Sequence, residues 1–127
     1  MPPFHYIVTD ASGKSVVLEH VDGDLTIHQN PFGVMSNSPT FDWHMTNLQN
    51  YISLSVKDVD SAKLGPVTLP ALGSGSGLHG MPGDFTPPSR FVRAAIYSQS
   101  AAPNVTAGDA VLAAFHILNQ FDIPKGS

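Results

Sequence analysis

The stretch LGSGSGLHGMPGDFTPPSRFVRAA, residues 72–95, decides how the rest of the chain is interpreted. Gly75, Gly77 and Gly80 spell the G-x-G-x-x-G pattern of dinucleotide-binding loops, in which the phosphates rest on a helix that follows at once. Here Met-Pro-Gly-Asp and a pair of prolines delay the helix until about Ser89, and no βαβ order surrounds the loop. The glycines therefore predict a loop packed closely against other backbone, not a nucleotide site.

Composition restricts the chain to one domain and excludes several classes of partner. Its 127 residues are 42% hydrophobic, with 13% charged residues and a net charge of −4. No cluster of Lys and Arg is present to neutralise phosphates, so we expect no nucleic-acid partner. The apolar runs are only a few residues long, so we expect no membrane partner either. Because the chain has no cysteine, disulfides, thiolate metal sites and a cysteine nucleophile within these residues are excluded.

The order of predicted elements indicates an α+β fold, with strands first and helices afterwards. β-Branched and aromatic residues separated by short turns predict antiparallel strands, and apolar residues at helical spacing predict helices. We expect, in order, a β-meander over His5–Asn30, a short strand at Gly33–Ser36, a helix from Thr40, a loop with at most short strands over 53–72, a helix over about Ser89–Ser98, and a helix whose capping box begins at Thr106.

Four segments resemble the choloylglycine hydrolase family of the N-terminal-nucleophile hydrolases, which contains conjugated bile acid hydrolases and penicillin V acylases. GLHGMPGDFTPPSRFVRAA is similar to the family segment that carries an active-site arginine. VMSNSPTFDWHMTNLQNY resembles its Asn-x-Pro-Thr-Phe-Asp stretch and the helix that follows. HYIVTDASGKSVVLEH is similar to a strand pair of the family, and FHILNQFDIPKG to a later helix and turn. The resemblance covers nearly the whole chain in order.

The resemblance implies part of an αββα four-layer sandwich with antiparallel sheets, and hydrolysis of a linear amide by an N-terminal cysteine whose own amino group acts as base. Asn37 matches the asparagine that donates to the oxyanion, and Arg90 matches the arginine beside the nucleophile. A small-molecule amide of the bile salt or penicillin V type is the implied substrate, no cofactor is implied, and the parent enzyme is expected to be a homotetramer. Both bacterial cytoplasm and periplasm remain open as its location.

The nucleophile that the resemblance implies is absent from these residues, since none of the 127 is cysteine. We therefore interpret residues 1–127 as an internal fragment of one such domain, without its N-terminal nucleophile segment and C-terminal strands, and predict that the fragment alone is inactive. The alternative function is a non-catalytic α+β module that retained the fold and binds a partner. A third hypothesis is a nucleotide-binding enzyme, which only the pattern of glycines favours.

Three further assignments concern side chains outside these motifs. His79, in the glycine loop, is a candidate for lining the substrate pocket. Arg93, one turn after Arg90, is predicted to be a structural ion-pair partner. The six histidines form no H-E-x-x-H pair and have no cysteine beside them, so we expect no metal site.

Overall fold

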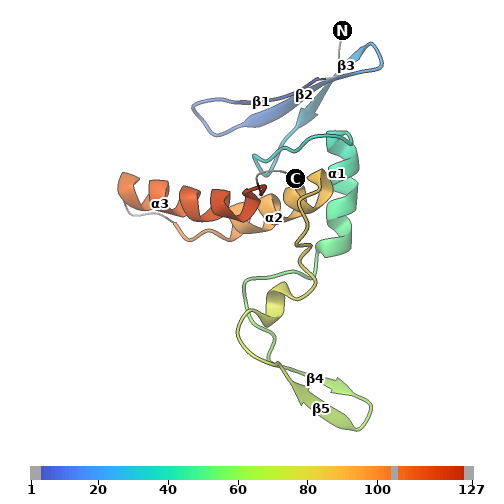
Figure 1. Cartoon of the computed structure of the whole chain (residues 1–127), viewed down its shortest axis with the longest axis vertical. Coiled ribbons are helices and arrows are strands. Elements are labelled where there is room, and N and C mark those ends of the chain that lie inside the picture. The colour runs from blue at the N-terminus through green and yellow to red at the C-terminus, as the bar shows by residue number, and fades with distance from the viewer. Residues whose placement is uncertain (1–3, 104–105, 125–127) are drawn as a thin grey trace.

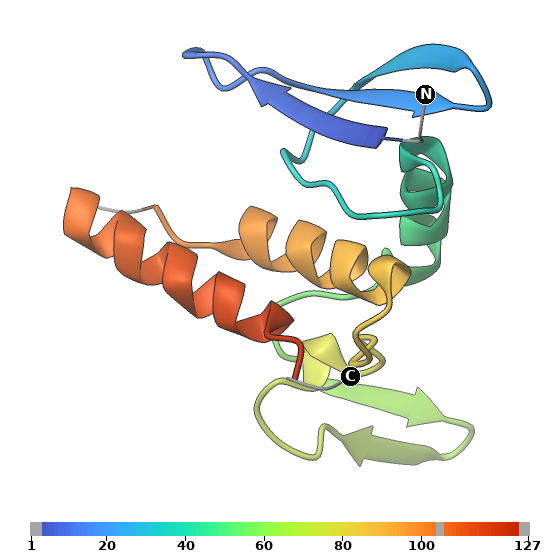
Figure 2. The same cartoon turned by 45° about the horizontal axis from the view of Figure 1, so that its top comes forward.

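The computed structural model describes residues 4–103 and 106–124, so Lys125 and Gly126 of the last motif lie outside the described residues. Strands β1 (Phe4–Thr9), β2 (Ser15–Val21) and β3 (Asp24–Gln29) precede helix α1 (Phe41–Leu48), and the short strands β4 (Ser61–Leu64) and β5 (Val67–Pro70) precede helices α2 (Pro87–Ser100) and α3 (Ala107–Leu118). Short 3-10 turns follow α1 (Gln49–Tyr51), form part of the glycine loop (Ser76–Leu78) and follow α3 (Asn119–Phe121). The three-stranded sheet and the β4–β5 hairpin lie at opposite ends of the molecule, with the helices between them (Figures 1 and 2).

The first sheet is the predicted meander, with strand order β1-β2-β3 and both pairs antiparallel. Its middle strand alternates between buried and partly buried residues, which is the period-2 pattern expected when one face of a sheet packs on helices. Ser15, Val17 and Glu19 point to the helical side, and across the strands His5 pairs with Glu19. The expectation of an antiparallel sheet at the N-terminus is confirmed.

The hydrophobic core lies where this sheet meets α1 and α2. Val17, Phe41 and Phe91 form its buried centre, one from each element, and the two phenyl rings meet edge to face with centroids 6.0 Å apart. Four partly buried residues extend it, namely Val34, Met35, Met45 and Leu48. The core therefore fixes the segment that leads from the sheet into α1 as well as the two helices.

The helices begin close to where the sequence predicts. α3 begins at the capping box, in which Thr106 and Asp109 each accept a hydrogen bond from the other's backbone N–H. α2 begins at Pro87, earlier than the predicted Ser89, because proline fits the first turn of a helix, where no intrahelical N–H bond is lost. No helix in the described part of the chain combines the length and apolar character that crossing a bilayer requires.

One predicted element is wrong, the strand at Gly33–Ser36. These residues form an irregular connection that pairs with no strand. Asn30 holds it locally, since its side-chain amide donates to the Val34 carbonyl at 3.0 Å. The apolar pair Val34-Met35 belongs to the core, so burial produced the pattern that suggested a strand.

Candidate active site

Asn37 and Arg90, far apart in the sequence, are in direct contact. Arg90 Nη2 donates to Asn37 Oδ1 at 2.8 Å, across 53 positions of the chain. A guanidinium only donates hydrogen bonds, so its partner must be the amide oxygen, and this fixes the orientation of the Asn37 amide. Its Nδ2 group, which carries two hydrogens, is then left to donate elsewhere. Arg90 Nε is buried and has no hydrogen-bond partner among the described residues.

Neighbouring contacts hold the loop that carries Asn37 on both helices. The Ser36 hydroxyl donates to the Pro87 carbonyl in the first turn of α2, at 3.0 Å. On the other side, His44 Nε2 in α1 lies 2.7 Å from the Asn37 carbonyl oxygen. The Asn37 backbone and side chain are therefore tied to two different helices.

The pair opens onto a hollow of about 690 Å³ between the sheet, the 33–37 loop and helices α2 and α3. Asn37, Arg90, Ser36 and His5 contribute polar groups to its wall, while most of the lining is apolar: Phe4, Ile7, Val34, Met35, Ala94, Ile117, Leu118 and Phe121. A few convergent polar groups in an apolar hollow are typical of small-molecule sites. The hollow suits a ligand with a bulky apolar portion and a polar group that reaches the pair.

The backbone N–H groups of the glycine loop are bound by a side chain of the protein itself. The Asp58 carboxylate accepts the N–H groups of Gly75 and Ser76 at 2.6 and 2.9 Å, so a side-chain anion already fills the position that a phosphate would take. Gly77 lies so close to the preceding segment that a Cβ there would overlap the carbonyl oxygens of Lys57 and Ser55. The prediction of close backbone packing therefore describes this loop correctly.

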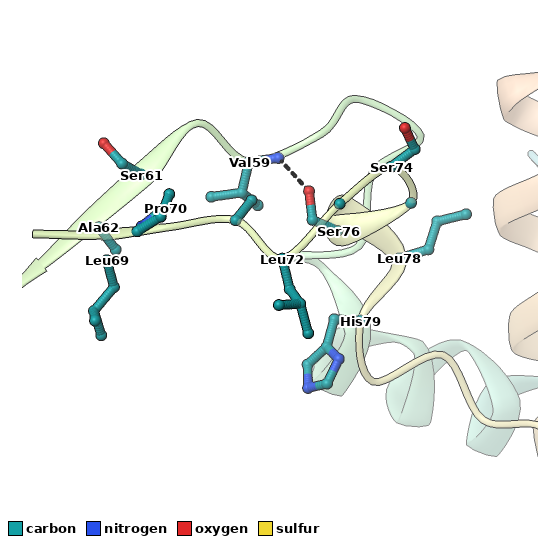
Figure 3. Close-up of a pocket in the computed structure, with 13 residues that line it drawn as sticks. Val59, Ser61, Ala62, Leu69, Pro70, Leu72, Ser74, Ser76, Leu78 and His79 are labelled. Carbon is teal, nitrogen blue, oxygen red and sulfur yellow. Dashed lines mark hydrogen bonds between the residues drawn. The ribbon is translucent and has the colours of Figure 1, made fainter.

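His79 lies in a different place from the pair. It lines a second hollow, of about 610 Å³, between the glycine loop and the β4–β5 hairpin. Figure 3 shows its imidazole beside Leu72, with the Ser76 hydroxyl accepting from the Val59 N–H at 2.9 Å. His79 is not among the residues that line the hollow of Asn37 and Arg90, so the structure does not bring the three candidates together.

Arg93 is structural, as predicted, but its partners are not acidic side chains. Its guanidinium is buried and donates to the carbonyls of Pro82, Asp84 and Gln120 at 2.8, 2.7 and 3.3 Å. The rings of Phe85 and Phe121 lie 6.0 and 5.4 Å from it. The five donors of a guanidinium suit this task, in which backbone acceptors replace the predicted ion pair. Arg93 thereby ties the segment before α2 to the turn after α3.

Asp84 organises the start of α2, the helix that carries Arg90. Its carboxylate accepts from the Ser89 hydroxyl at 2.6 Å, the Thr86 hydroxyl at 2.5 Å and the Thr86 N–H at 2.9 Å. Hydrogen bonds lower the pKa of Asp84 to about 2, with the largest contribution from Ser89 and the next from Thr86. An ionised carboxylate at this end also complements the helix dipole, which Arg90 opposes.

One group of side chains in the described residues has the composition of a metal site. Single ligand atoms of Glu19, His28 and Asp42 lie within 4.8 Å of one another. Both Glu19 oxygens are already engaged, however: Oε1 with the Phe41 N–H at 2.8 Å and His5 Nδ1 at 2.6 Å, and Oε2 with His28 Nε2 at 3.2 Å. The group also lies at the positive end of α1, where a cation is disfavoured. We assign it to joining the sheet to the helix.

Comparison with known proteins identifies the family of the chain. A sequence model of the linear amide C-N hydrolases, choloylglycine hydrolase family, matches residues 1–127. The chain is 44% identical to the bile salt hydrolase/transferase of Clostridium perfringens over 97% of its own length and 37% of that protein. The chain spans about two-fifths of the length of these curated relatives.

Solved structures give the same result. A variant of conjugated bile acid hydrolase from Clostridium perfringens superposes with a TM-score of 0.81 at 41% identity, covering 97% of this chain and 37% of that one. Penicillin V acylase from Agrobacterium tumefaciens gives a TM-score of 0.72 at 27% identity, covering 96% and 32%. The α+β fold with antiparallel sheets is therefore the N-terminal-nucleophile hydrolase fold. The chain belongs to the choloylglycine hydrolase family of linear amide C-N hydrolases.

Proposed function

We propose that these residues are one part of an enzyme that hydrolyses a linear amide C–N bond, and that Asn37 and Arg90 are their contribution to its active site. The observation that carries the proposal is the 2.8 Å hydrogen bond between these two side chains at the edge of an apolar hollow. The two residues belong to separate sequence motifs, SNSPTFD and GDFTPPSRFVRAA. Membership of the amide hydrolase family supplies the reaction class.

In the proposed reaction a cysteine thiolate attacks the amide carbonyl carbon. The carbonyl π electrons move to oxygen, which becomes an oxyanion, and collapse of that intermediate expels the amine after it gains a proton. Water then hydrolyses the thioester. Because the 127 residues contain no cysteine, we assign the nucleophile to a segment of the domain outside them.

Asn37 is proposed to stabilise the oxyanion through Nδ2. Arg90 holds Oδ1, so the amide cannot reverse without losing a charge-assisted hydrogen bond. One such preorganised donor is worth about 3–4 kcal/mol in transition-state stabilisation in other hydrolases. Arg90 also places a positive charge at the edge of the hollow, which favours the thiolate over the thiol in a nucleophile bound there.

The proposed substrates are small amides with a bulky apolar acyl group, either conjugated bile salts or penicillin V. The apolar wall of the hollow accommodates such a group, and named relatives include enzymes of both kinds.

Assembly as a homotetramer is the second part of this proposal. Sedimentation velocity of the complete domain checks it, and a monomer would contradict it.

The test uses a complete domain, defined here as this chain joined to the parts of the Clostridium perfringens enzyme that it does not cover. Release of amino acid from glycocholate and taurocholate, and of 6-aminopenicillanic acid from penicillin V, measures the activity. We expect Asn37→Ala to lower kcat by about 10²–10³-fold and Arg90→Ala to lower activity by at least a similar factor. Asn50→Ala, an exposed amide on the turn after α1, is the matched control and should retain activity.

The outcomes separate the enzyme from the alternative. Hydrolysis that collapses in both site variants but not in Asn50→Ala supports the proposal and identifies the substrate. A folded complete domain that cleaves neither class of amide contradicts it and favours a non-catalytic binding module.

A further inference from the structure

His44 is almost entirely buried, with 1% of its surface exposed, although it carries two polar ring nitrogens. Its imidazole stacks on the Phe91 ring, with centroids 4.9 Å apart and planes inclined by 14°, and Trp43 meets it edge-on. Nε2 lies 2.7 Å from the Asn37 carbonyl oxygen. Nδ1 is buried and has no hydrogen-bond partner within the described ranges.

These contacts settle which nitrogen carries the hydrogen. A carbonyl oxygen only accepts, so Nε2 must donate, and the bond to Asn37 is the one polar contact that the described residues give this ring. An apolar residue of similar size would fill the same space without leaving Nδ1 unsatisfied. Packing therefore explains why position 44 holds a flat ring of this size, but not why that ring is an imidazole with a hydrogen-bond donor.

The two bonds on Asn37 act on different parts of one residue. Arg90, on α2, holds the side-chain oxygen, while His44, on α1, holds the backbone carbonyl. With both fixed, rotation of the side chain about its own backbone is restricted, and the direction of Nδ2 is set by two helices that pack on the same core. A preorganised donor loses its catalytic value when its direction varies.

We infer that His44 is a positioning residue of the active site: its Nε2–H holds the Asn37 backbone so that Nδ2 is aimed at the developing oxyanion. This inference rests on the proposed function of Asn37. His44 touches no substrate in this arrangement and acts only through Asn37. The requirement is for a buried donor at the place of Nε2, not for a histidine as such.

Two substitutions in the complete domain separate donor from packing. His44→Phe keeps a ring against Phe91 and removes the donor, whereas the amide nitrogen of His44→Gln reaches the place of Nε2 and restores it. We expect His44→Phe to lower kcat by about 10-fold or more with KM changed less than about 2-fold, since substrate binding does not need the oxyanion donor. His44→Gln should recover most of kcat.

His28→Phe is the matched control, because it removes the contact of the partly buried His28 with Glu19 but none with Asn37. It should lower thermal stability and leave kcat within about 2-fold. Hydrogen exchange over residues 36–40, a range that leaves out the Phe41 N–H bonded to Glu19, should rise in His44→Phe alone, which reports the loss of the bond to Asn37 independently of activity.

The possible results distinguish a failure of the positioning role of His44 from a failure of the proposed function. If Asn37→Ala is inactive while His44→Phe keeps full kcat, the positioning role is overturned and the proposed function stands. If His44→Phe and His44→Gln lose activity equally, packing explains His44 and the inference is also overturned. If the unaltered complete domain cleaves no amide, the proposed function fails and the positioning role fails with it.

Discussion

At the scale of single residues, Glu19 connects more of the molecule than any motif suggests. It is 3% exposed, yet its carboxylate accepts from the first N–H of α1 and bonds histidines on both flanking strands. A buried carboxylate with this many donors is stable because each oxygen is satisfied. Glu19 therefore joins the three-stranded sheet to the start of α1.

Glu19→Gln should destabilise the complete domain by about 1–3 kcal/mol, because the amide nitrogen must face one of the donors that the carboxylate now satisfies. Urea unfolding gives the free energy directly. Asp24→Asn, on an exposed position of β3, is the control and should change stability by less than about 0.5 kcal/mol. Equal stability of the two variants would show that the Glu19 contacts contribute little.

The residue scale also shows how far sequence reasoning reached. The family motifs predict Asn37 and Arg90 as site residues, and the structure brings the two side chains into contact. The sequence does not reveal the contact of His44, since a histidine in a helix gives no sign that its partner is a carbonyl seven positions earlier. The three partners of Arg93 are backbone carbonyls, and backbone leaves no trace in a sequence.

At the scale of elements, the glycine loop depends on one glycine for its fit. A Cβ on Gly77 would overlap two carbonyl oxygens of the 55–57 segment, and the backbone there is held by a Ser55 N–H to Gly77 carbonyl bond of 2.9 Å. Gly83, by contrast, has open space around its Cβ position and no positive φ. The two glycines of this loop region thus provide a matched comparison.

Gly77→Ala should destabilise the domain by about 1–3 kcal/mol through overpacking, while Gly83→Ala should be close to neutral. Thermal unfolding of both variants checks this. If Gly77→Ala were the more stable of the two, the close approach of the 55–57 segment would be wrong.

The start of α2 should respond to acid. The folded-state pKa of Asp84 is lowered from 3.8 to about 2, so its contribution to stability is complete above the unfolded value and is lost as the pH falls towards about 2. The difference in unfolding free energy between the parent and Asp84→Asn should therefore shrink from about pH 7 to about pH 3. A difference that stays constant over this range would contradict the assignment.

Elements were predicted best where local signals are strong. The capping box at Thr106, the alternation along β2 and the helical spacing after Thr40 all correspond to elements of the structure. The segment at 33–36 failed because a buried irregular connection and a buried strand have the same apolar content. Only the partner strand distinguishes them, and that information is not local.

At the scale of the whole molecule, the first sheet and α3 each have an apolar surface that the described residues leave uncovered. The sheet face that points away from the helices exposes more than half of Tyr6, Val8, Leu25 and Ile27, and α3 exposes a similar share of Val111, Leu112, Phe115 and Leu118. Exposed apolar areas of this kind mark surfaces that pack against something else. In the proposed four-layer domain a second sheet packs on the first surface.

The isolated 127-residue chain should therefore self-associate, because both surfaces are removed from water when copies meet. Light scattering of the purified chain measures this. Replacing Leu112 and Phe115 by lysine should reduce the association, whereas Val67→Lys and Leu69→Lys on the distant hairpin provide the control. A monodisperse monomer of the unaltered chain would contradict the prediction.

The hairpin formed by β4 and β5 has one further consequence. Its turn, at Gly65-Pro66, lies at the far end of the molecule from the first sheet (Figure 1), and its strands pair only with each other. The hairpin lies between Asn37 and Arg90 in the sequence, but neither of its strands takes part in the hydrogen bond between these two side chains. Protein engineers can treat the turn as an attachment point: an epitope or a fluorophore inserted there travels with the domain while the two residues keep their contact.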